Sequence, residues 1–118
     1  MSCLFNSMHY FLPNISSGEI RNKICDYLQN NGSLMDGLNT NEIINMEGNN
    51  YIQNMRNTST WGGAIEIQAA CNIWQWRIIV LNHRDRNHSN IEFLPISNTY
   101  NKTIQLQWTG GHYEPIRN

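Results

Sequence analysis

The stretch TWGGAIEIQAACNIWQWRIIVL, residues 60–81, decides the fold. After Gly62 and Gly63, its first part carries apolar residues on most sides of a helix, which is typical of a helix buried at the centre of a domain. Its last part, residues 76–81, is a short run rich in β-branched residues and predicts a buried strand. A buried helix that runs directly into a buried strand marks the boundary between two differently patterned parts of the chain.

Helical patterns fill the first two-thirds of the chain. Apolar residues recur at helical spacing within residues 2–13 and predict a helix there. Ser16 and Glu19 form a capping box at the start of a second helix, which ends at Asn31. Between residues 41 and 55 the helical pattern is weaker and is interrupted by a Gly-Asn-Asn run.

Strand patterns fill the last third of the chain. Residues 91–94 read as a short strand, and residues 103–108 alternate apolar with polar side chains, the signature of a half-buried strand. Gly110 and Gly111 predict a tight hairpin into a last strand at residues 112–116. We expect four strands, mostly antiparallel, packed on the helices. This segregation predicts the α+β class rather than alternating βαβ units.

Length and composition predict one globular domain that spans residues 1–118. Hydrophobic residues make up 40% of the chain, enough for a core, and the formal net charge of −1 gives no support for a nucleic-acid partner. No apolar run reaches the roughly 18 residues that a membrane span requires, and the first residues lack the regions of a signal peptide. We therefore expect a cytoplasmic monomer without a membrane partner.

The three cysteines, Cys3, Cys25 and Cys71, are an odd number and form no C-x-x-C pair. This usage fits reduced thiols better than a disulfide framework. Cys25 and Cys71 fall inside apolar helices, where we expect them to be small buried hydrophobic residues. No pair of histidines has the spacing of zinc ligands, so we expect no metal site and no cofactor.

Cys3 and His112 occupy positions that suit catalysis. Cys3 lies at the predicted N-terminal tip of a helix, where unpaired N–H groups and the helix dipole lower the pKa of a thiol. His112 follows Gly110 and Gly111, which permit a tight turn and the close approach of a ligand. Position alone leaves two alternatives open, because Cys3 also fits an inert terminal residue and His112 a surface or capping residue.

Four segments, in the same order along the chain, resemble motifs of the ovarian-tumour (OTU) family of cysteine proteases. MSCLFNSM at residues 1–8 resembles the nucleophile motif, and IRNKICDYLQNN at residues 20–31 resembles the second helix. The Tyr and Met of residues 51–55, followed by TWGGAIEIQA at residues 60–69 with its Glu66, resemble a third motif. WTGGHYEPI at residues 108–116 resembles the closing motif that contains the histidine. Together the segments cover essentially the whole chain, which makes the joint match far more specific than any one of them.

The resemblance implies a papain-like fold with Cys3 as nucleophile and His112 as its base. The imidazole would take the thiol proton, and the thiolate would attack an isopeptide carbonyl. The implied substrate is ubiquitin, polyubiquitin or a ubiquitin-like modifier, cut after its C-terminal Gly-Gly. The resemblance places the following residues along the channel for that tail: Trp61, Gly62, Gly63, Gly110, Gly111 and Tyr113.

Glu114 departs from the family's pattern. The third member of the triad is usually an Asn or Asp two residues after the histidine, and this sequence has Glu114 there. A glutamate carboxylate can orient His112 and stabilise its charged form, although the extra methylene changes its reach. The alternative is a solvent-facing glutamate on a strand. The resemblance therefore leaves a second function open, a catalytically weak or inactive ubiquitin-binding module.

A small stand-alone OTU domain in an Asn-rich chain also resembles viral deubiquitinases that blunt host defence. This resemblance predicts a viral source and a place of action in the host cytoplasm.

Overall fold

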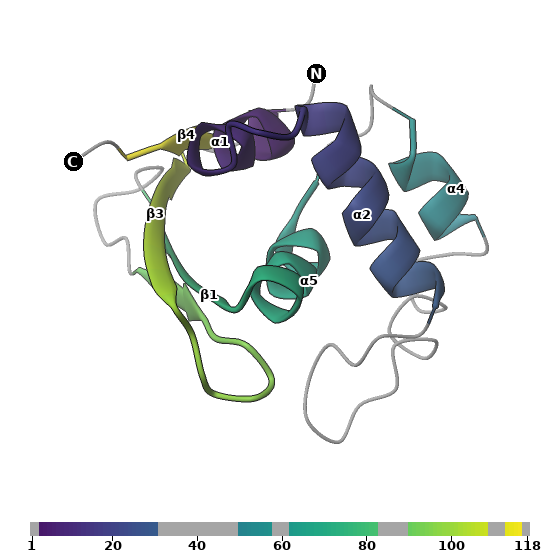
Figure 1. Cartoon of the computed structure of the whole chain (residues 1–118). Helices are drawn as coiled ribbons and strands as arrows, with labels where there is room; N and C mark the ends of the chain where they lie inside the picture. The colour runs from purple at the N-terminus through teal and green to yellow at the C-terminus, as the bar shows by residue number, and fades with distance from the viewer. Residues whose placement is uncertain (1–2, 31–49, 58–61, 83–89, 109–112, 117–118) are drawn as a thin grey trace.

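A curved four-stranded sheet and a set of helices make up the structure, a computed structural model that describes residues 3–30, 50–57, 62–82, 90–108 and 113–116 (Figure 1). Its elements, in chain order, are α1 (Cys3–Phe11), α2 (Ser17–Gln29), α4 (Tyr51–Met55), α5 (Ala64–Trp74), β1 (Trp76–Asn82), β2 (Ile91–Phe93), β3 (Lys102–Trp108) and β4 (Tyr113–Pro115). Helix α5 lies between the sheet and α2, α4 lies on the outer side of α2, and α1 lies beside β4. Helices precede strands, so the predicted α+β class is confirmed.

The helices form where local signals in the sequence predict them. Helix α1 begins at Cys3 and ends at Phe11, close to its predicted end. At the start of α2, the side-chain oxygen of Ser16 accepts a hydrogen bond of 3.1 Å from the N–H of Glu19. This bond satisfies one of the N–H groups that a helix start leaves unpaired. Of the weakly patterned residues 41–55, the described part forms the short helix α4, and the remainder lies outside the described residues.

The four strands form one mixed sheet in the order β2-β1-β3-β4. The pairings of β1 with β2 and of β3 with β4 are antiparallel, as expected for a mostly antiparallel sheet. The central pairing, of β1 with β3, is parallel and begins with Trp76 opposite Lys102. Strands β3 and β4 therefore pair as predicted, while the expected tight turn at Gly110 and Gly111 lies outside the described residues.

Gln75 joins the starts of the two parallel strands. This residue ends α5 in the left-handed region, with φ at 58°, and turns the chain into β1. Its carbonyl oxygen accepts a hydrogen bond of 2.8 Å from the N–H of Asn101, directly before β3. Its side-chain oxygen accepts a bond of 2.9 Å from the hydroxyl of Ser97. The two strand starts are therefore held side by side, and the strands run in the same direction.

Helix α5 is the centre of the core, as its apolar sequence predicts. Ile67 is 1% exposed, and Ala69 and Ala70 are completely buried. Burial of a large aliphatic side chain contributes about 1.5–3 kcal/mol. The other buried hydrophobic residues come from every layer: Leu4, Phe5, Met8, Ile20, Ile24, Cys25, Leu28, Met55, Cys71, Trp76, Ile78, Val80, Ile104 and Leu106. One continuous core therefore joins the helices to the sheet.

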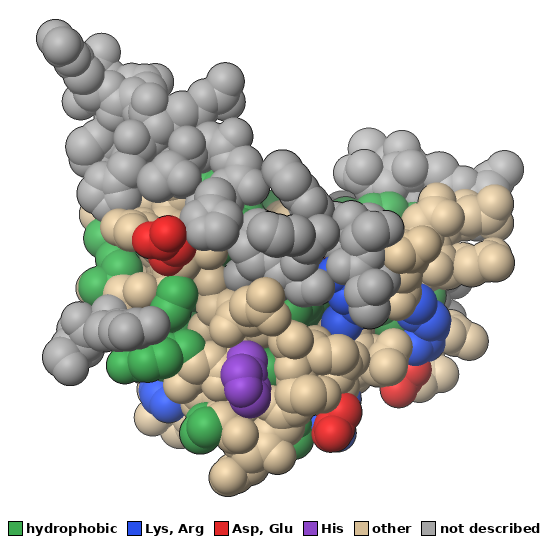
Figure 2. Space-filling view, turned by 90° about the horizontal axis from the view of Figure 1, so that it is seen from above, with side chains coloured by type: hydrophobic (Ala, Val, Ile, Leu, Met, Phe, Trp, Pro, Cys, Tyr) green, Lys and Arg blue, Asp and Glu red, His purple; other side chains and the backbone are tan. Residues whose placement is uncertain are grey.

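Charged groups are dispersed over the face that contains α1 and β4. Figure 2 shows this face, with Lys and Arg side chains in small groups near Asp and Glu side chains and with hydrophobic side chains gathered at one side. In the described part of this face, neither sign of charge forms a continuous patch. No helix in the described ranges combines the length and the apolar character that a membrane crossing requires.

A buried arginine links three helices. Arg21 on α2 is 1% exposed, and its guanidinium group lies 4.2 Å from the ring centroid of Phe5 on α1. Its Nη1 donates a hydrogen bond of 2.6 Å to the carbonyl oxygen of Met55 at the end of α4. Stacking on an aromatic face and a directed hydrogen bond are interactions that the planar guanidinium makes better than a lysine ammonium.

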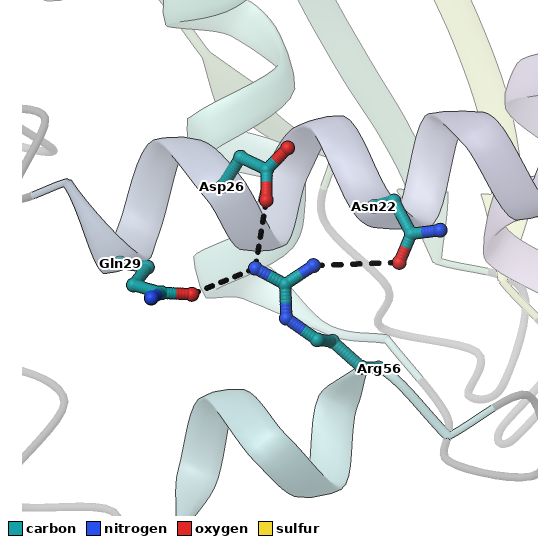
Figure 3. A network of polar contacts seen from close by, with 4 residues as sticks. All are labelled: Asn22, Asp26, Gln29 and Arg56. Atoms are coloured by element: carbon teal, nitrogen blue, oxygen red, sulfur yellow. Dashed lines mark hydrogen bonds and ion pairs between the residues drawn. The ribbon is translucent and has the colours of Figure 1, made fainter.

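A second arginine joins α4 to α2 at the surface. Arg56 donates hydrogen bonds to Asp26 at 2.7 Å, to Gln29 at 2.8 Å and to Asn22 at 3.4 Å, all on α2 (Figure 3). The side chains of Arg56 and Asp26 are 32% and 63% exposed. Water therefore screens this network, unlike the contacts of Arg21.

We expect the two arginines to differ in their contribution to stability. Arg21→Ala leaves a buried carbonyl without its donor and a cavity beside Phe5, so it should lower the free energy of unfolding by about 3 kcal/mol or more. Arg56→Ala removes exposed contacts and should lower it by about 1 kcal/mol or less. Urea denaturation of both variants measures the difference. A loss for Arg56→Ala as large as that for Arg21→Ala would contradict this ranking.

Candidate active site

The start of α1 is the first component of the site. Cys3 is the first residue of this helix, as predicted, and its side chain lies outside the described part. The first N–H groups of a helix have no partner within the helix and favour an anion near them. The helix is held by Leu4, Phe5 and Met8, which are 1%, 0% and 0% exposed. Residue 3 therefore belongs to a helix that the core fixes in place.

Strand β4 lies directly against α1. The hydroxyl of Ser7 on α1 donates a hydrogen bond of 3.0 Å to the carbonyl oxygen of Tyr113, the first residue of β4. The two residues are 106 positions apart in the sequence, and Figure 1 shows the two elements side by side. His112 immediately precedes this strand and lies outside the described residues. The fold therefore brings the sequence neighbours of Cys3 and His112 into contact.

Glu114 occupies the middle of β4 and is exposed. Its partner across the sheet is Gln107, whose side-chain nitrogen donates a hydrogen bond of 2.7 Å to the carboxylate. Neighbouring residues of a strand point to opposite faces, so Glu114 and Tyr113 point to different faces of the sheet. The carboxylate is oriented by a neutral donor on β3.

Gly62 lies against the first turn of α1. A Cβ atom added to this residue would lie 2.6 Å from Cδ2 of Leu4 and 3.1 Å from the ring of Phe5. Real Cβ contacts are not this short, so any larger residue here would force the buried side chain of Leu4 to shift. The glycine that the resemblance assigns to the substrate channel is therefore also required by packing.

A buried carboxylate holds the next residue in place. Glu66 on α5 is 1% exposed and accepts a hydrogen bond of 2.7 Å from the N–H of Gly63, the N-cap residue. Its other oxygen accepts a hydrogen bond from the hydroxyl of Tyr51 on α4. Burial raises the pKa of Glu66, while the bonds from Tyr51 and Gly63 act in the opposite direction. The segment that precedes α5 is thus fixed by packing on one side and by a carboxylate on the other.

The two remaining cysteines are unsuited to nucleophilic attack. Cys25 and Cys71 are completely buried, as the sequence predicts. Burial raises the pKa of Cys25 to about 11 and that of Cys71 to about 12. A thiol must lose its proton to act as a nucleophile, so neither is reactive near neutral pH. If the site uses a thiol, the sequence leaves Cys3.

The structure places part of the predicted site. Around α1 it brings together the backbone of Cys3, the packed Gly62 and the carbonyl of Tyr113. Gly63 follows Gly62 at the start of α5. The other predicted residues lie outside the described part of the chain: Trp61, Gly110, Gly111 and His112.

Three residues near the site, Ser7, Tyr51 and Glu66, have roles that were not predicted from the sequence. Tyr51 and Glu66 lie within the third motif, and the structure shows that they hydrogen-bond to each other and support Gly63. The presence of a tyrosine and an acidic residue in one motif was the feature of the sequence that could have predicted this contact. For Ser7 the sequence offered no signal, because its partner is Tyr113 at the other end of the chain.

The start of α1 is a position at which a thiolate would be favoured. Within the described ranges, no group of three or more His, Cys, Asp or Glu residues could hold a metal ion. A helix start that stabilises a thiolate, next to a strand that follows a histidine, is typical of papain-like cysteine proteases.

The chain belongs to the family of OTU-like cysteine proteases, since the model of that family matches residues 2–113. Among curated proteins it is similar to "Ubiquitin thioesterase OTU1" of Xenopus laevis, with 26% identity over 98% of this chain and 38% of that protein. The protein of the same name from Rattus norvegicus is 27% identical over 98% of this chain and 33% of its own length. The chain thus spans between 33% and 38% of the length of these relatives. They give no support for the expected viral source.

Solved structures share the fold. One is titled "Structure of Ovarian Tumor (OTU) domain in complex with Ubiquitin" and superimposes with a TM-score of 0.74 at 23% identity, over 96% of this chain and 62% of that one. An OTU deubiquitinase from Wolbachia pipientis wMel, solved bound to ubiquitin, gives a TM-score of 0.67 at 16% identity, over 98% and 89%. The predicted OTU fold is therefore confirmed.

We expect Glu66 to make stability depend on pH. Its raised pKa means that the folded protein holds this proton to a higher pH than the unfolded chain, whose carboxyl has the ordinary value of 4.5. The free energy of unfolding should therefore fall as pH rises above that value. Glu66→Gln keeps an amide oxygen for one donor and removes the titration. Urea denaturation of both proteins between about pH 4 and about pH 7 tests this, and parallel pH profiles would contradict it.

Proposed function

We propose that the chain is a deubiquitinating cysteine protease in which Cys3 is the nucleophile and His112 the general base. The observation that carries the proposal is the contact between α1, which begins at Cys3, and β4, which follows His112. The burial of Cys25 and Cys71 supports it, because it removes the other thiols as candidates.

The proposed reaction proceeds in two halves. The imidazole of His112 takes the proton of the Cys3 thiol, and the thiolate attacks the carbonyl carbon of the isopeptide bond. In this proposal the N–H of Cys3, at the start of α1, would stabilise the oxyanion. The imidazolium then gives its proton to the departing lysine amine and leaves a thioester on Cys3. A water molecule, deprotonated by the same imidazole, hydrolyses the thioester and releases the carboxylate and the thiol.

The proposed substrate is ubiquitin or polyubiquitin, with ubiquitin-like modifiers as related candidates. Two solved structures of the same fold are described as containing ubiquitin. The tail of the modifier would lie in a channel formed by Trp61, Gly62, Gly63, Gly110, Gly111 and Tyr113. A Gly-Gly tail has no side chains, so a narrow channel with glycine walls selects it by excluding larger residues. A cytoplasmic place of action and a monomeric state stay predictions.

Glu114 is the proposed third catalytic residue. Its carboxylate lies two positions after His112 and is oriented by Gln107. In this role it would hold the imidazole in the productive tautomer and stabilise its charged form. Its exposure and its bond to Gln107 also suit the alternative, a surface glutamate in a module that binds ubiquitin without cutting it.

Turnover of a fluorogenic ubiquitin substrate tests the proposed function. Cys3→Ala and His112→Ala should each lower kcat/KM by about 1,000-fold or more, because each removes a group that forms or breaks a bond. The matched control is Cys71→Ala, which removes a buried thiol from α5 and should retain turnover. Undiminished turnover by Cys3→Ala would end the proposal. Tight binding of ubiquitin without wild-type turnover would select the binding module.

The role of Glu114 has its own test. Glu114→Ala should lower kcat by roughly 10- to 100-fold while KM stays within about twofold, because an orienting carboxylate acts on the charged imidazole. Gln107→Ala removes the orienting partner on β3 and leaves the carboxylate, so it should lower kcat by less. A Glu114→Ala variant with wild-type kcat would show that the residue is a surface glutamate.

A further inference from the structure

Ser7 links the two segments that carry the proposed nucleophile and base. Its hydroxyl donates a hydrogen bond of 3.0 Å to the carbonyl oxygen of Tyr113, across 106 positions of sequence. Ser7 lies about one helical turn after Cys3 and on the same side of α1. Tyr113 directly follows His112. We propose that Ser7 is a positioning residue that sets the distance between the thiol of Cys3 and the imidazole of His112, an inference that rests on the proposed function.

The direction of the backbone in β4 makes this contact specific. The N–H of Ile116 donates a hydrogen bond of 3.0 Å to the carbonyl oxygen of Gln105, so the backbone of Ile116 faces β3. Backbone groups of successive residues alternate between the two edges of an antiparallel strand. Tyr113 therefore turns its carbonyl away from β3 and toward α1, where Ser7 donates to it. The hydrogen bond thus fixes the position of the start of β4 along the axis of α1.

A hydrogen bond fixes relative position in a way that apolar packing does not. Leu4, Phe5 and Met8 hold α1 to the core by burial, which is largely non-directional. The bond from Ser7 requires a particular distance and angle, and Ser7 is only 3% exposed, so little water competes for it. Loss of the hydroxyl should leave the core intact and let the start of β4 shift along the helix.

Catalysis is sensitive to a shift of this kind. Proton transfer between thiol and imidazole requires the two groups within hydrogen-bonding reach, and misplacement of a reacting group by about 1 Å can cost about 100-fold in rate. Ser7 is not one of the proposed channel residues. Its loss should therefore affect the protonation of Cys3 and the value of kcat, with little effect on KM.

The experiment compares wild type with Ser7→Ala, Ser7→Thr and the matched control Ser16→Ala. Ser16 also stabilises the fold through one side-chain hydrogen bond, which it accepts from the N–H of Glu19 at the start of α2. The first readout is the rate at which iodoacetamide alkylates Cys3, measured by mass spectrometry from about pH 5 to about pH 9. The thiols of Cys25 and Cys71 are completely buried and should not react in the folded protein. The second readout is kcat and KM on the fluorogenic ubiquitin substrate.

We expect Ser7→Ala to move the alkylation profile of Cys3 upward by at least about one pH unit, toward an ordinary thiol, and to lower kcat about 10-fold or more. Ser7→Thr retains the donor and should lie nearer wild type, and Ser16→Ala should match wild type in both readouts. Profiles of Ser7→Ala and wild type that coincide, or a wild-type profile already that of an ordinary thiol, would overturn the positioning role. A shifted profile without turnover by wild type would uphold that role and reject the proposed function.

Discussion

The candidate site depends on how closely the segment before α5 approaches the first turn of α1. Any side chain at position 62 would overlap Leu4 and Phe5, because even a Cβ atom there would lie 2.6 Å from Leu4. This approach covers the first turn of α1, in which Leu4 and Phe5 are 1% and 0% exposed. The proposed role of Cys3 as nucleophile would require such a fixed helix, because the sulfur must stay within reach of a base.

Two buried charged side chains also stabilise the packing of the helices. Arg21 links α2 to α1 and α4, and Glu66 links α5 to α4 through Tyr51 and to the N-cap at Gly63. Charges are costly to bury unless hydrogen bonds compensate them, and within the described chain no buried side-chain nitrogen or oxygen lacks a hydrogen-bond partner. Hydrogen bonds have required directions, so this polar scaffold specifies one arrangement of the helices where apolar packing alone would permit several.

The sequence predicts this fold best where the signals are local. The cap at Ser16, the apolar pattern of α5 and the alternation in β3 all act within a few residues, and the corresponding elements formed where they were expected. The parallel pairing of β1 with β3 was not anticipated, because the contacts of Gln75 with Ser97 and Asn101 that hold the two strand starts together are non-local. Composition and spacing alone made Cys3 and His112 two of several possible catalytic residues. The resemblance to the OTU family strengthened the prediction that they are the nucleophile and the base. Neither the residue pattern nor the resemblance predicted the hydrogen bond between Ser7 and Tyr113, since a serine within a helix has many ordinary explanations.

The docking of strand β4 on α1 links the formation of the candidate site to the formation of the fold. It spans Tyr113–Pro115, and in the described sheet its neighbour is β3 alone, so backbone pairing by itself can hold it only weakly. The contact with α1 adds the stability that pairing with β3 lacks. Ser7 donates a hydrogen bond to the carbonyl oxygen of Tyr113, which the outer edge of β4 would otherwise expose. Docking of the last strand on the first helix closes the longest loop of the chain, a slow and entropically costly step. The same step brings the neighbours of Cys3 and His112 together, so a chain in which β4 has detached from α1 loses the site before it loses its core.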